Sequence, residues 1–434
     1  SMKLYFLSGY LLVFTGCNMF QNNNTTPKWS DSLTIYEVNL RQFTSEGTID
    51  AFRNHLPRLK SMGVGILWFM PIHPIGKLNR KGTLGSYYSV MDYYQVNPEF
   101  GTLNEFKSLV ETIHEMGMYV IIDWVANHTS WDNNIVDKNP NWFTKSQTGK
   151  FQHPPGTDWL DVIDLNYDNY DLRKYMTNAM AFWVKYVNVD GFRCDVANLV
   201  PTDFWKSAIS ELRKIKPIFM LAESDEPDLL HKAFDTDYNW GLYHLLKNIA
   251  NGQQQSSEIK EYYLNLPKSY PSNSLRMNFL DNHDENSWGR IMVNHFGKNI
   301  YPIMTMIFTL PGVPMIYSGQ EAKLNKQLKF FEKDSIEWGN YPDSQFYQNL
   351  IMLKKNNPVF WNNNYSISFV DSLPDNIIGF YRKIGDEEYG VMINLTSKSN
   401  VVNITKSVDV IFKDEKSQLD HISPSGYLVY KIKK

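Results

Sequence analysis

The chain has 434 residues, enough for two or three domains or for one barrel with additions. Its 43 Lys and Arg residues against 46 Asp and Glu residues give a formal net charge of −3, so the composition does not favour nucleic-acid binding. Only two cysteines are present, which excludes a framework of disulfide bonds.

The first residues look like an export signal and not like part of the fold. After Met2 and Lys3 comes an apolar run, residues 4–14, that is too short to span a bilayer as a stable helix. It ends in Phe-Thr-Gly-Cys, which resembles a bacterial lipobox with Cys17 as the lipidated residue. We therefore expect residues 1–31 to be a signal and a polar tether, and the protein to be exported and lipid-anchored, facing the periplasm or the cell surface. A plain secretory signal, and hence a secreted protein, is the alternative.

Strand-like and helix-like runs alternate over residues 32–357. Apolar runs predict strands at residues 33–43, 64–72, 118–128, 191–197, 218–224, 275–284 and 313–319. Amphipathic or capped runs predict helices at residues 48–63, 102–117, 171–187, 203–215 and 301–310. Continuous apolar strands separated by helices indicate parallel strands covered on both faces, and about eight such units fit this length. The fold class expected is α/β, a (β/α)8 TIM barrel formed by residues 32–127 and 167–357.

Two regions depart from this alternation. Residues 128–166 follow the third strand, are rich in Asn, Asp, Pro and Trp, and show no clear period, so we expect a small excursion domain there. Residues 358–434 consist of short alternating runs, which predict a C-terminal antiparallel β-sandwich domain.

Acids and histidines stand at the ends of four predicted strands, where the catalytic groups of a barrel are found. They are Asp123, Asn127 and His128 on the third strand, Arg193 and Asp195 on the fourth, Glu223 on the fifth, and Asn282, His283 and Asp284 on the seventh. A single acid at the start of a loop has ordinary structural explanations, but convergence of all of them on one rim indicates an active site. Charges inside an apolar strand also have to be paired or functional.

Four of these segments resemble a known family. The stretches DWVANH, GFRCDVANLV, LAES and FLDNHD have the order and spacing of the four signature regions of the α-amylase family of glycoside hydrolases. Further likenesses lie at residues 86–101, 162–166 and 311–321, and the whole is similar to bacterial α-amylases of the lipoprotein type. The resemblance covers the chain from residue 32 to its end.

The resemblance implies that Asp195 is the catalytic nucleophile, Glu223 the general acid/base and Asp284 the stabiliser of the transition state. These roles suit glycosidic bond cleavage, which needs one carboxylate to attack the anomeric carbon and one carboxylic acid to protonate the leaving oxygen. Arg193 on the same strand face is expected to keep Asp195 ionised. The negative charges of Asp195 and Asp284 are expected to raise the pKa of Glu223, so that it keeps its proton.

The same resemblance supplies the substrate-binding residues. Tyr88 corresponds to an aromatic platform under the sugar, and His128 and His283 to donors toward its hydroxyls. Arg193 completes this predicted set. Asn198 stands where many relatives have a lysine that helps to hold the sugar on the reducing side.

A calcium ion is implied at the base of the excursion domain. Asn127 and Asp164 match two calcium ligands of the family, and Leu199 stands where relatives use a histidine carbonyl. All three supply oxygen, as a hard cation requires. The alternative is that Asn127 and Asp164 only hydrogen-bond the excursion domain to the barrel. No organic cofactor is expected.

The expected function is retaining hydrolysis of α-1,4-glucosidic bonds in starch or maltooligosaccharides, with an α-glucan as the only partner. One alternative is an α-1,6-glucosidase, a neopullulanase-like enzyme or a glucanotransferase of the same family, since Val196 after the nucleophile is also seen in α-1,6-acting relatives. Another is a non-catalytic glycan-binding lipoprotein of a starch-uptake system. The presence of all three acids argues against this last alternative.

Overall fold

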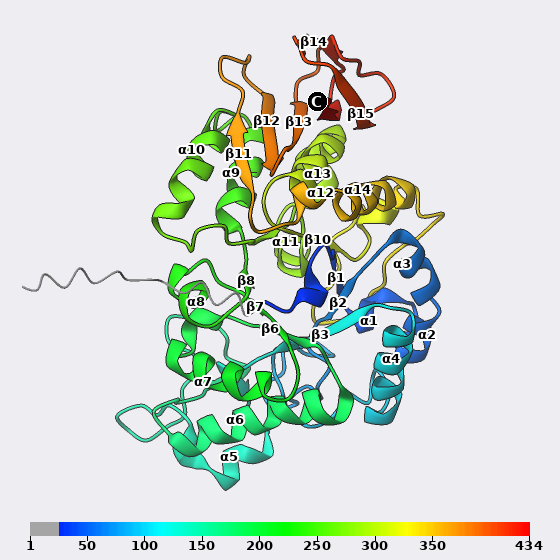
Figure 1. Ribbon diagram of the computed structural model, residues 1–434. Coiled ribbons are helices and arrows are strands. Elements are labelled where there is room, and N and C mark those ends of the chain that lie inside the picture. The colour runs from blue at the N-terminus through cyan, green and yellow to red at the C-terminus, as the bar shows by residue number, and fades with distance from the viewer. Residues whose placement is uncertain (1–25) are drawn as a thin grey trace, which may run out of the picture.

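The computed structural model describes residues 26–434, so residues 1–25 of the predicted signal and tether, Cys17 included, lie outside the described residues. Figure 1 shows three parts: a central barrel, a small excursion with α5 at one end, and an antiparallel β-domain at the other. Among residues 26–434, none of the helices is long and apolar enough to cross a lipid bilayer.

The barrel consists of eight parallel strands in the order β8-β7-β6-β3-β2-β1-β10-β9. Their bounds are β1 Ile35–Val38, β2 Ile66–Phe69, β3 Tyr119–Trp124, β6 Gly191–Cys194, β7 Phe219–Ala222, β8 Thr236–Asp237, β9 Met277–Asn278 and β10 Val313–Tyr317. The two ends of this order meet through a parallel bridge between Tyr238 and Met277. The sheet is therefore closed, and the predicted TIM barrel is confirmed.

The sixth strand, β8, was not predicted from the sequence. It has only two residues, Thr236 and Asp237. The apolar residues around it form a run that is too short to show a strand period.

The helices of the structure are α1 Leu40–Phe43, α2 Ile49–Arg53, α3 Leu56–Met62, α4 Leu103–Glu115, α5 Asn134–Lys138, α6 Tyr170–Phe182, α7 Thr202–Arg213, α8 Pro227–Lys232, α9 Trp240–Ala250, α10 Glu258–Asn265, α11 His283–Trp288, α12 Met292–Phe296, α13 Ile300–Thr309 and α14 Ser344–Asn356. Thr102 caps α4 by accepting a hydrogen bond of 3.1 Å from the Glu105 backbone N–H. The single helix expected at residues 48–63 is wrong. It is broken into α2 and α3, because Pro57 has no N–H to continue the ladder and restricts the residue before it.

Two apolar layers hold the barrel together, because side chains alternate along each strand. Trp68, Ile121 and Leu221 belong to the cluster inside the barrel. Leu67, Ile122 and Cys194 belong to the cluster between strands and helices. Cys194 is thus a buried, packed residue on the face of its strand opposite to that of Arg193.

The excursion after β3 contains α5 and a two-stranded antiparallel ribbon of β4 His128–Ser130 and β5 Val162–Asp164. In this ribbon His128 pairs with Asp164. The ribbon therefore starts at the rim of the barrel and returns to it.

The C-terminal part has a five-stranded antiparallel sheet and a two-stranded one. The first contains β11 Ser366–Phe369, β12 Ile377–Ile384, β13 Glu387–Asn394, β17 Tyr427–Ile432 and β15 Val408–Lys413, and the second β14 Asn400–Val401 and β16 His421–Ile422. A cluster including Met392, Ile422 and Leu428 packs the two layers together. In Figure 1 these strands, orange to red, lie beside α13.

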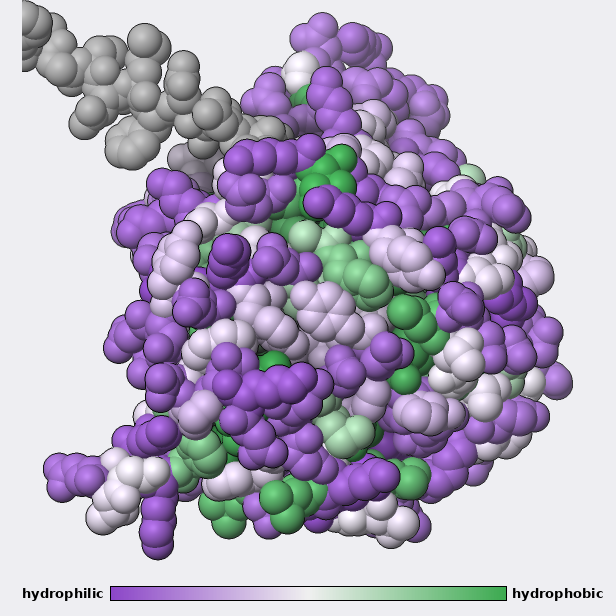
Figure 2. All heavy atoms as spheres, turned by 90° about the horizontal axis from the view of Figure 1, so that it is seen from below, coloured by the Kyte–Doolittle hydropathy of each residue, from purple (hydrophilic) through white to green (hydrophobic). Residues whose placement is uncertain are grey.

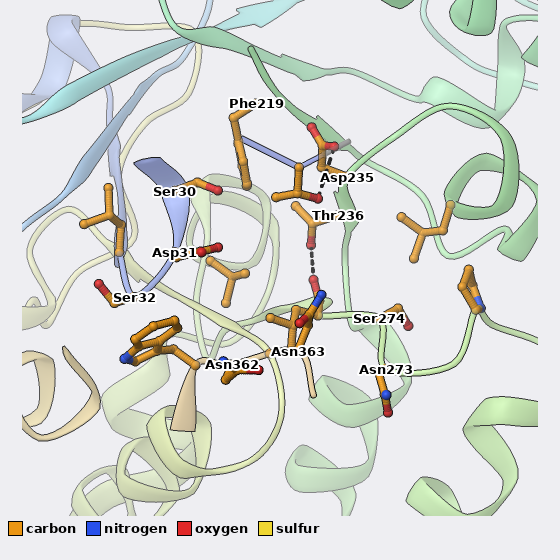
Figure 3. A pocket seen from close by; sticks show the side chains of 18 of the residues that line it. Ser30, Asp31, Ser32, Phe219, Asp235, Thr236, Asn273, Ser274, Asn362 and Asn363 are labelled. Carbon is orange, nitrogen blue, oxygen red and sulfur yellow. Dashed lines mark hydrogen bonds between the residues drawn. The ribbon is translucent and has the colours of Figure 1, made fainter. Parts of the chain in front are cut away.

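The surface seen in Figure 2 is mostly hydrophilic, with hydrophobic side chains interspersed. A cavity of about 370 Å³ lies where strands of the barrel begin, lined by residues such as Leu33, Phe219 and Thr236 (Figure 3). Thr236 there donates a hydrogen bond of 2.8 Å to the Leu275 carbonyl. None of the predicted site residues lines this cavity, so it is separate from the chemistry at the other end of the strands.

Candidate active site

A cavity of about 470 Å³ lies at the carboxyl ends of the barrel strands. The predicted catalytic and substrate-binding residues that line it are Tyr88, His128, Asp195, Glu223, His283 and Asp284. They come from the segment after β2, from β4, from the ends of β6 and β7, and from the first turn of α11. The fold thus brings together residues that are almost 200 positions apart in the sequence.

Arg193 is the exception, because it lies beneath the cavity and not in its wall. Its side chain is 1% exposed, and its Nη1 lies 2.9 Å from Asp123 Oδ1 and 3.0 Å from Asp195 Oδ1. Its Nη2 lies 2.9 Å from Glu223 Oε2. One guanidinium therefore holds three carboxylates, and the predicted role of Arg193 in binding substrate becomes one of positioning the acids.

The two central acids have environments that differ from the expectation. Burial, followed by the neighbouring Glu223 carboxylate, raises the pKa of Asp195 well above its usual range. Burial acts on Glu223 in the same direction, but Arg193, Asp195 and the Val196 N–H, 2.9 Å from Oε2, hold the pKa of Glu223 below its usual value. These directions are the reverse of those predicted from the sequence, where the charge of Arg193 was expected to act on Asp195 alone. The guanidinium reaches both.

His283 joins Asp284 to the floor of the cavity. Its Nε2 lies 3.5 Å from Asp284 Oδ2, and its Nδ1 bonds to the buried carboxylate of Glu37 on β1. Burial lowers the pKa of His283, but the charges of Asp284 and Glu37 outweigh it and raise the pKa to about 9. This imidazole is therefore charged at neutral pH.

His128 has the opposite character. Burial lowers its pKa to about 4, and its Nε2 lies 3.9 Å from Asp195 Oδ2. Asn127 Nδ2 lies 3.1 Å from its other ring nitrogen. His128 is therefore neutral at the same pH at which His283 is charged.

Tyr88 is fixed as a flat wall of the cavity. Its hydroxyl lies 3.0 Å from both Asp123 Oδ2 and His283 Nε2. Its ring stacks on that of His283, with centroids 5.5 Å apart and planes 22° apart. Trp68 Nε1 donates to the same Asp123 oxygen at 3.1 Å, so the buried acid holds the tyrosine in place.

Several residues of the site were not identified from the sequence. They are Glu37 below His283, Tyr238 against Arg193, and the cavity-lining Lys81, Trp159, Asp161, Trp288, Phe330 and Phe331. Glu37 carried the same signal that singled out Arg193, a charge inside an apolar strand. Tyr238 directly follows the two-residue strand β8, and the remaining residues lie in loops or in the short helix α11, where no period points to the cavity.

The predicted calcium ligands lie partly together. The Leu165 N–H donates to the Asn127 carbonyl at 3.1 Å, and Asp164 lies in the same ribbon. Burial raises the pKa of Asp164, whose Oδ2 accepts a hydrogen bond of 2.6 Å from Thr144. No cationic side chain among residues 26–434 forms an ion pair with Asp164, and within the same residues no group of three or more His, Cys, Asp or Glu side chains is arranged to hold a metal ion. Leu199 lies in a short 3-10 turn, Ala197–Leu199, after β6.

The arrangement can therefore carry out acid–base and nucleophilic chemistry on a ligand that lies against Tyr88. Two carboxyl groups converge on one guanidinium, a third lies beside a charged histidine, and an aromatic face and a neutral histidine complete the walls. Paired carboxylates in a cavity of this kind are typical of glycoside hydrolysis.

Comparison with known proteins agrees with this chemistry. The alpha amylase catalytic domain family matches residues 18–160 and 139–373. Alpha-amylase MalA of Haloarcula japonica is 23% identical over 401 residues, which cover 88% of this chain and 58% of that protein's length.

Two solved structures are similar over almost their whole length. An alpha-amylase from Lactobacillus plantarum has a TM-score of 0.83 and 29% identity, covering 93% of this chain and 99% of that one. The noncanonic maltogenic alpha-amylase AmyB from Thermotoga neapolitana has a TM-score of 0.79 and 30% identity, covering 92% and 96%. With the match of the catalytic domain over most of the chain, these likenesses show that this protein is an enzyme of the alpha-amylase family of glycoside hydrolases.

Proposed function

We propose that the enzyme hydrolyses α-1,4-glucosidic bonds of starch or maltooligosaccharides with retention of configuration. The observation that carries this proposal is the placement of Asp195 and Glu223 on the two terminal nitrogens of one guanidinium, at 3.0 and 2.9 Å. Carboxyl groups held side by side in this way suit double displacement, for which a separation of about 5 to 5.5 Å is usual. An inverting enzyme needs room for a water molecule between them.

In the first half of the reaction, an Asp195 oxygen attacks the anomeric carbon and the glycosidic C–O bond breaks. Glu223 gives its proton to the departing oxygen, which leaves as the new chain end. In the second half, Glu223 takes a proton from water, and that water attacks the anomeric carbon of the glycosyl ester. Asp195 is released as a carboxylate, so the enzyme returns to its initial state.

The proton of the acid pair has to be on Glu223 when the substrate is in place. In the free site the pKa of Asp195 is raised and that of Glu223 is lowered, so the bound substrate has to favour the opposite order. We infer that the glycosidic oxygen does this by accepting a hydrogen bond from Glu223, which stabilises the protonated form of that carboxyl group. Positive charge that develops on the sugar then favours ionised Asp195 and Asp284.

The remaining residues bind and orient the sugar. The face of Tyr88 lies under the sugar ring, and charged His283 donates a hydrogen bond to a sugar hydroxyl. His128 also donates to a sugar hydroxyl, but because it is neutral it places no second cation beside the positive charge that develops on the sugar. Arg193 keeps both reactive acids in position from below.

We further propose that a calcium ion joins the excursion to the barrel through Asn127, Asp164 and the Leu199 carbonyl. When bound, the ion would supply structural cross-linking by oxygen coordination and no part of the chemistry.

The experiment that tests the proposed function is a product profile on amylose, pullulan and isomaltose, with the anomer followed by NMR. Cleavage of amylose to α-anomeric products supports the proposal. Release of glucose from isomaltose alone would show specificity for α-1,6 bonds. Products longer than the starting maltooligosaccharide would show transfer of glycosyl units. Inactivity on all three, with amylose still bound, would favour a glycan-binding protein.

A further inference from the structure

An aromatic wall leads out of the catalytic cavity. The rings of Tyr88 and Phe330 are nearly parallel, with planes 8° apart and centroids at 6.4 Å. Trp288 follows, with its ring centroid 5.4 Å from that of Phe330 and 5.6 Å from that of Phe331. Both phenylalanines and Trp288 line the cavity. Three segments that are distant in sequence thus form one continuous aromatic surface.

Trp288 differs from the other tryptophans of the described chain in its exposure. It is 59% exposed, and it is the one tryptophan among residues 26–434 that stands with the large exposed apolar side chains. Its indole contacts two phenylalanines, each tilted by 47° to it, while more than half of the side chain stays open to solvent. An open, supported aromatic face at the edge of an active site is suited to stacking on a flat apolar ligand surface.

The helix that carries Trp288 also carries a catalytic acid. Asp284 lies in the first turn of α11 and Trp288 at its last residue, four positions later, so both side chains project from the same face. Four residues of helix span about 6 Å. Trp288 therefore stands one turn away from the acid that faces the reacting sugar, at the place of a neighbouring ring and not of the reacting ring itself.

The wall is also held rigidly. Asn286 donates to the Lys326 carbonyl at 3.0 Å and accepts from the Leu328 N–H at 3.0 Å. These two bonds fasten the segment that carries Phe330 to α11. The Phe331 carbonyl accepts a hydrogen bond of 3.0 Å from the Leu84 N–H, which fastens the segment that leads to Tyr88 to the same segment. Preorganised aromatic contacts bind a ligand without the cost of ordering them first.

We propose that Trp288 forms a distal sugar-binding subsite on the glycone side of the cleavage point. On the proposed function, Tyr88 is the platform of the sugar that Asp195 attacks and the aglycone leaves past Glu223. We assign the wall, which leads from Tyr88 through Phe330 to Trp288, to the non-reducing side of that sugar. The ligand is a second or third glucose unit of the same α-glucan. This subsite rests on the proposed function and adds a preference for longer chains.

The test compares one substrate that reaches Trp288 with one that does not. Maltoheptaose spans the cavity and the wall, whereas α-glucosyl fluoride fills only the position at Tyr88. One indole face covers on the order of 50 Å² of apolar surface, which corresponds to about tenfold in kcat/KM. Trp288→Ala should therefore lower kcat/KM for maltoheptaose about tenfold, and kcat/KM for α-glucosyl fluoride should stay within about twofold of the wild-type value.

Two further variants separate stacking from structure. Trp288→Phe should keep most of the activity on maltoheptaose, because it keeps an aromatic face. Tyr170→Ala removes another aromatic side chain, which is 76% exposed and lies outside the cavity lining. It should leave kcat/KM unchanged for both substrates. An equal loss on both substrates in Trp288→Ala, or no loss on either, would overturn the subsite.

A binding measurement separates this inference from the proposed function. If wild type cleaves neither substrate, the proposed function fails. The subsite is then decided by calorimetric titration of maltoheptaose into Asp195→Asn protein with and without Trp288→Ala. A drop in affinity of about tenfold supports the subsite, and equal affinity or no binding to either protein refutes it.

Discussion

Replacing Glu37 by Gln should make the stability of the enzyme depend on pH in a specific way. Glu37 binds His283 from below, and together with Asp284 it raises the pKa of His283 from 6.5 to about 9. A difference of that size corresponds to on the order of 3 kcal/mol in favour of the folded, protonated form. Because the folded pKa is the higher one, this contribution is complete below pH 6.5 and is lost as the pH rises through 9.

Glu37→Gln keeps the shape but removes one of the two carboxylates that act on His283. We expect it to lower the free energy of unfolding by about 1–2 kcal/mol at pH 6, and the difference from wild type to shrink toward zero above about pH 9.5. The assay is urea unfolding of both proteins at intervals from pH 6 to pH 10.

Glu321→Gln provides the matched control. Glu321 is also fully buried, but its partners are Arg58, 3.0 Å away, which stays charged throughout this range, and the Tyr36 hydroxyl, 2.8 Å away, whose pKa burial raises well above its usual value. Its difference from wild type should therefore stay constant from pH 6 to pH 10. A loss in Glu37→Gln that is equally constant would mean that Glu37 acts by packing alone, and would refute the reasoning.

Two other predictions concern the acids and the metal. Arg193→Met leaves three buried carboxylates without their cation, so we expect a loss of about 3–5 kcal/mol in unfolding free energy at pH 7. The loss should be smaller at pH 4, because burial raises the pKa of Asp123 to about 6 and that of Asp195 above its usual range, so that these two acids take up protons. Equal losses in urea unfolding at both pH values would contradict this. Chelator should lower the Tm of wild type and calcium should restore it, with Asp164→Asn insensitive to both; a wild-type Tm that chelator leaves unchanged would remove the ion.

The architecture was largely predictable because it rests on long periodic runs. The strands at Ile66–Phe69 and Tyr119–Trp124 lie inside apolar segments bounded by helices, which only a parallel sheet covered on both faces explains. β8 has two residues, too few for a period, and it is held in place by its neighbours across the barrel. The break between α2 and α3 could have been predicted from Pro57, which lacks an N–H, but the amphipathic pattern on both sides of it favoured one continuous helix.

The location of the site was predictable, but its electrostatics were not. Rim residues such as Asp195 and Glu223 follow from the rule that catalytic groups lie at strand ends. The reach of Arg193 across three strands depends on how the side chains lie inside the barrel, and it reverses the expected order of the two pKa values. Trp288 gave no signal either, because its position beside Phe330 depends on two separate loops.

The most direct test of the central claim, that Glu223 is the acid and Asp195 the nucleophile, is the leaving-group dependence of Glu223→Gln. Fluoride departs without protonation, whereas the sugar alkoxide of a maltooligosaccharide does not. We therefore expect the turnover rate of Glu223→Gln to fall at least about a hundredfold more on maltoheptaose than on α-maltosyl fluoride. Asp195→Asn should lose activity on both substrates. Equal losses on the two substrates in Glu223→Gln, or turnover of maltoheptaose by Asp195→Asn, would contradict the assignment.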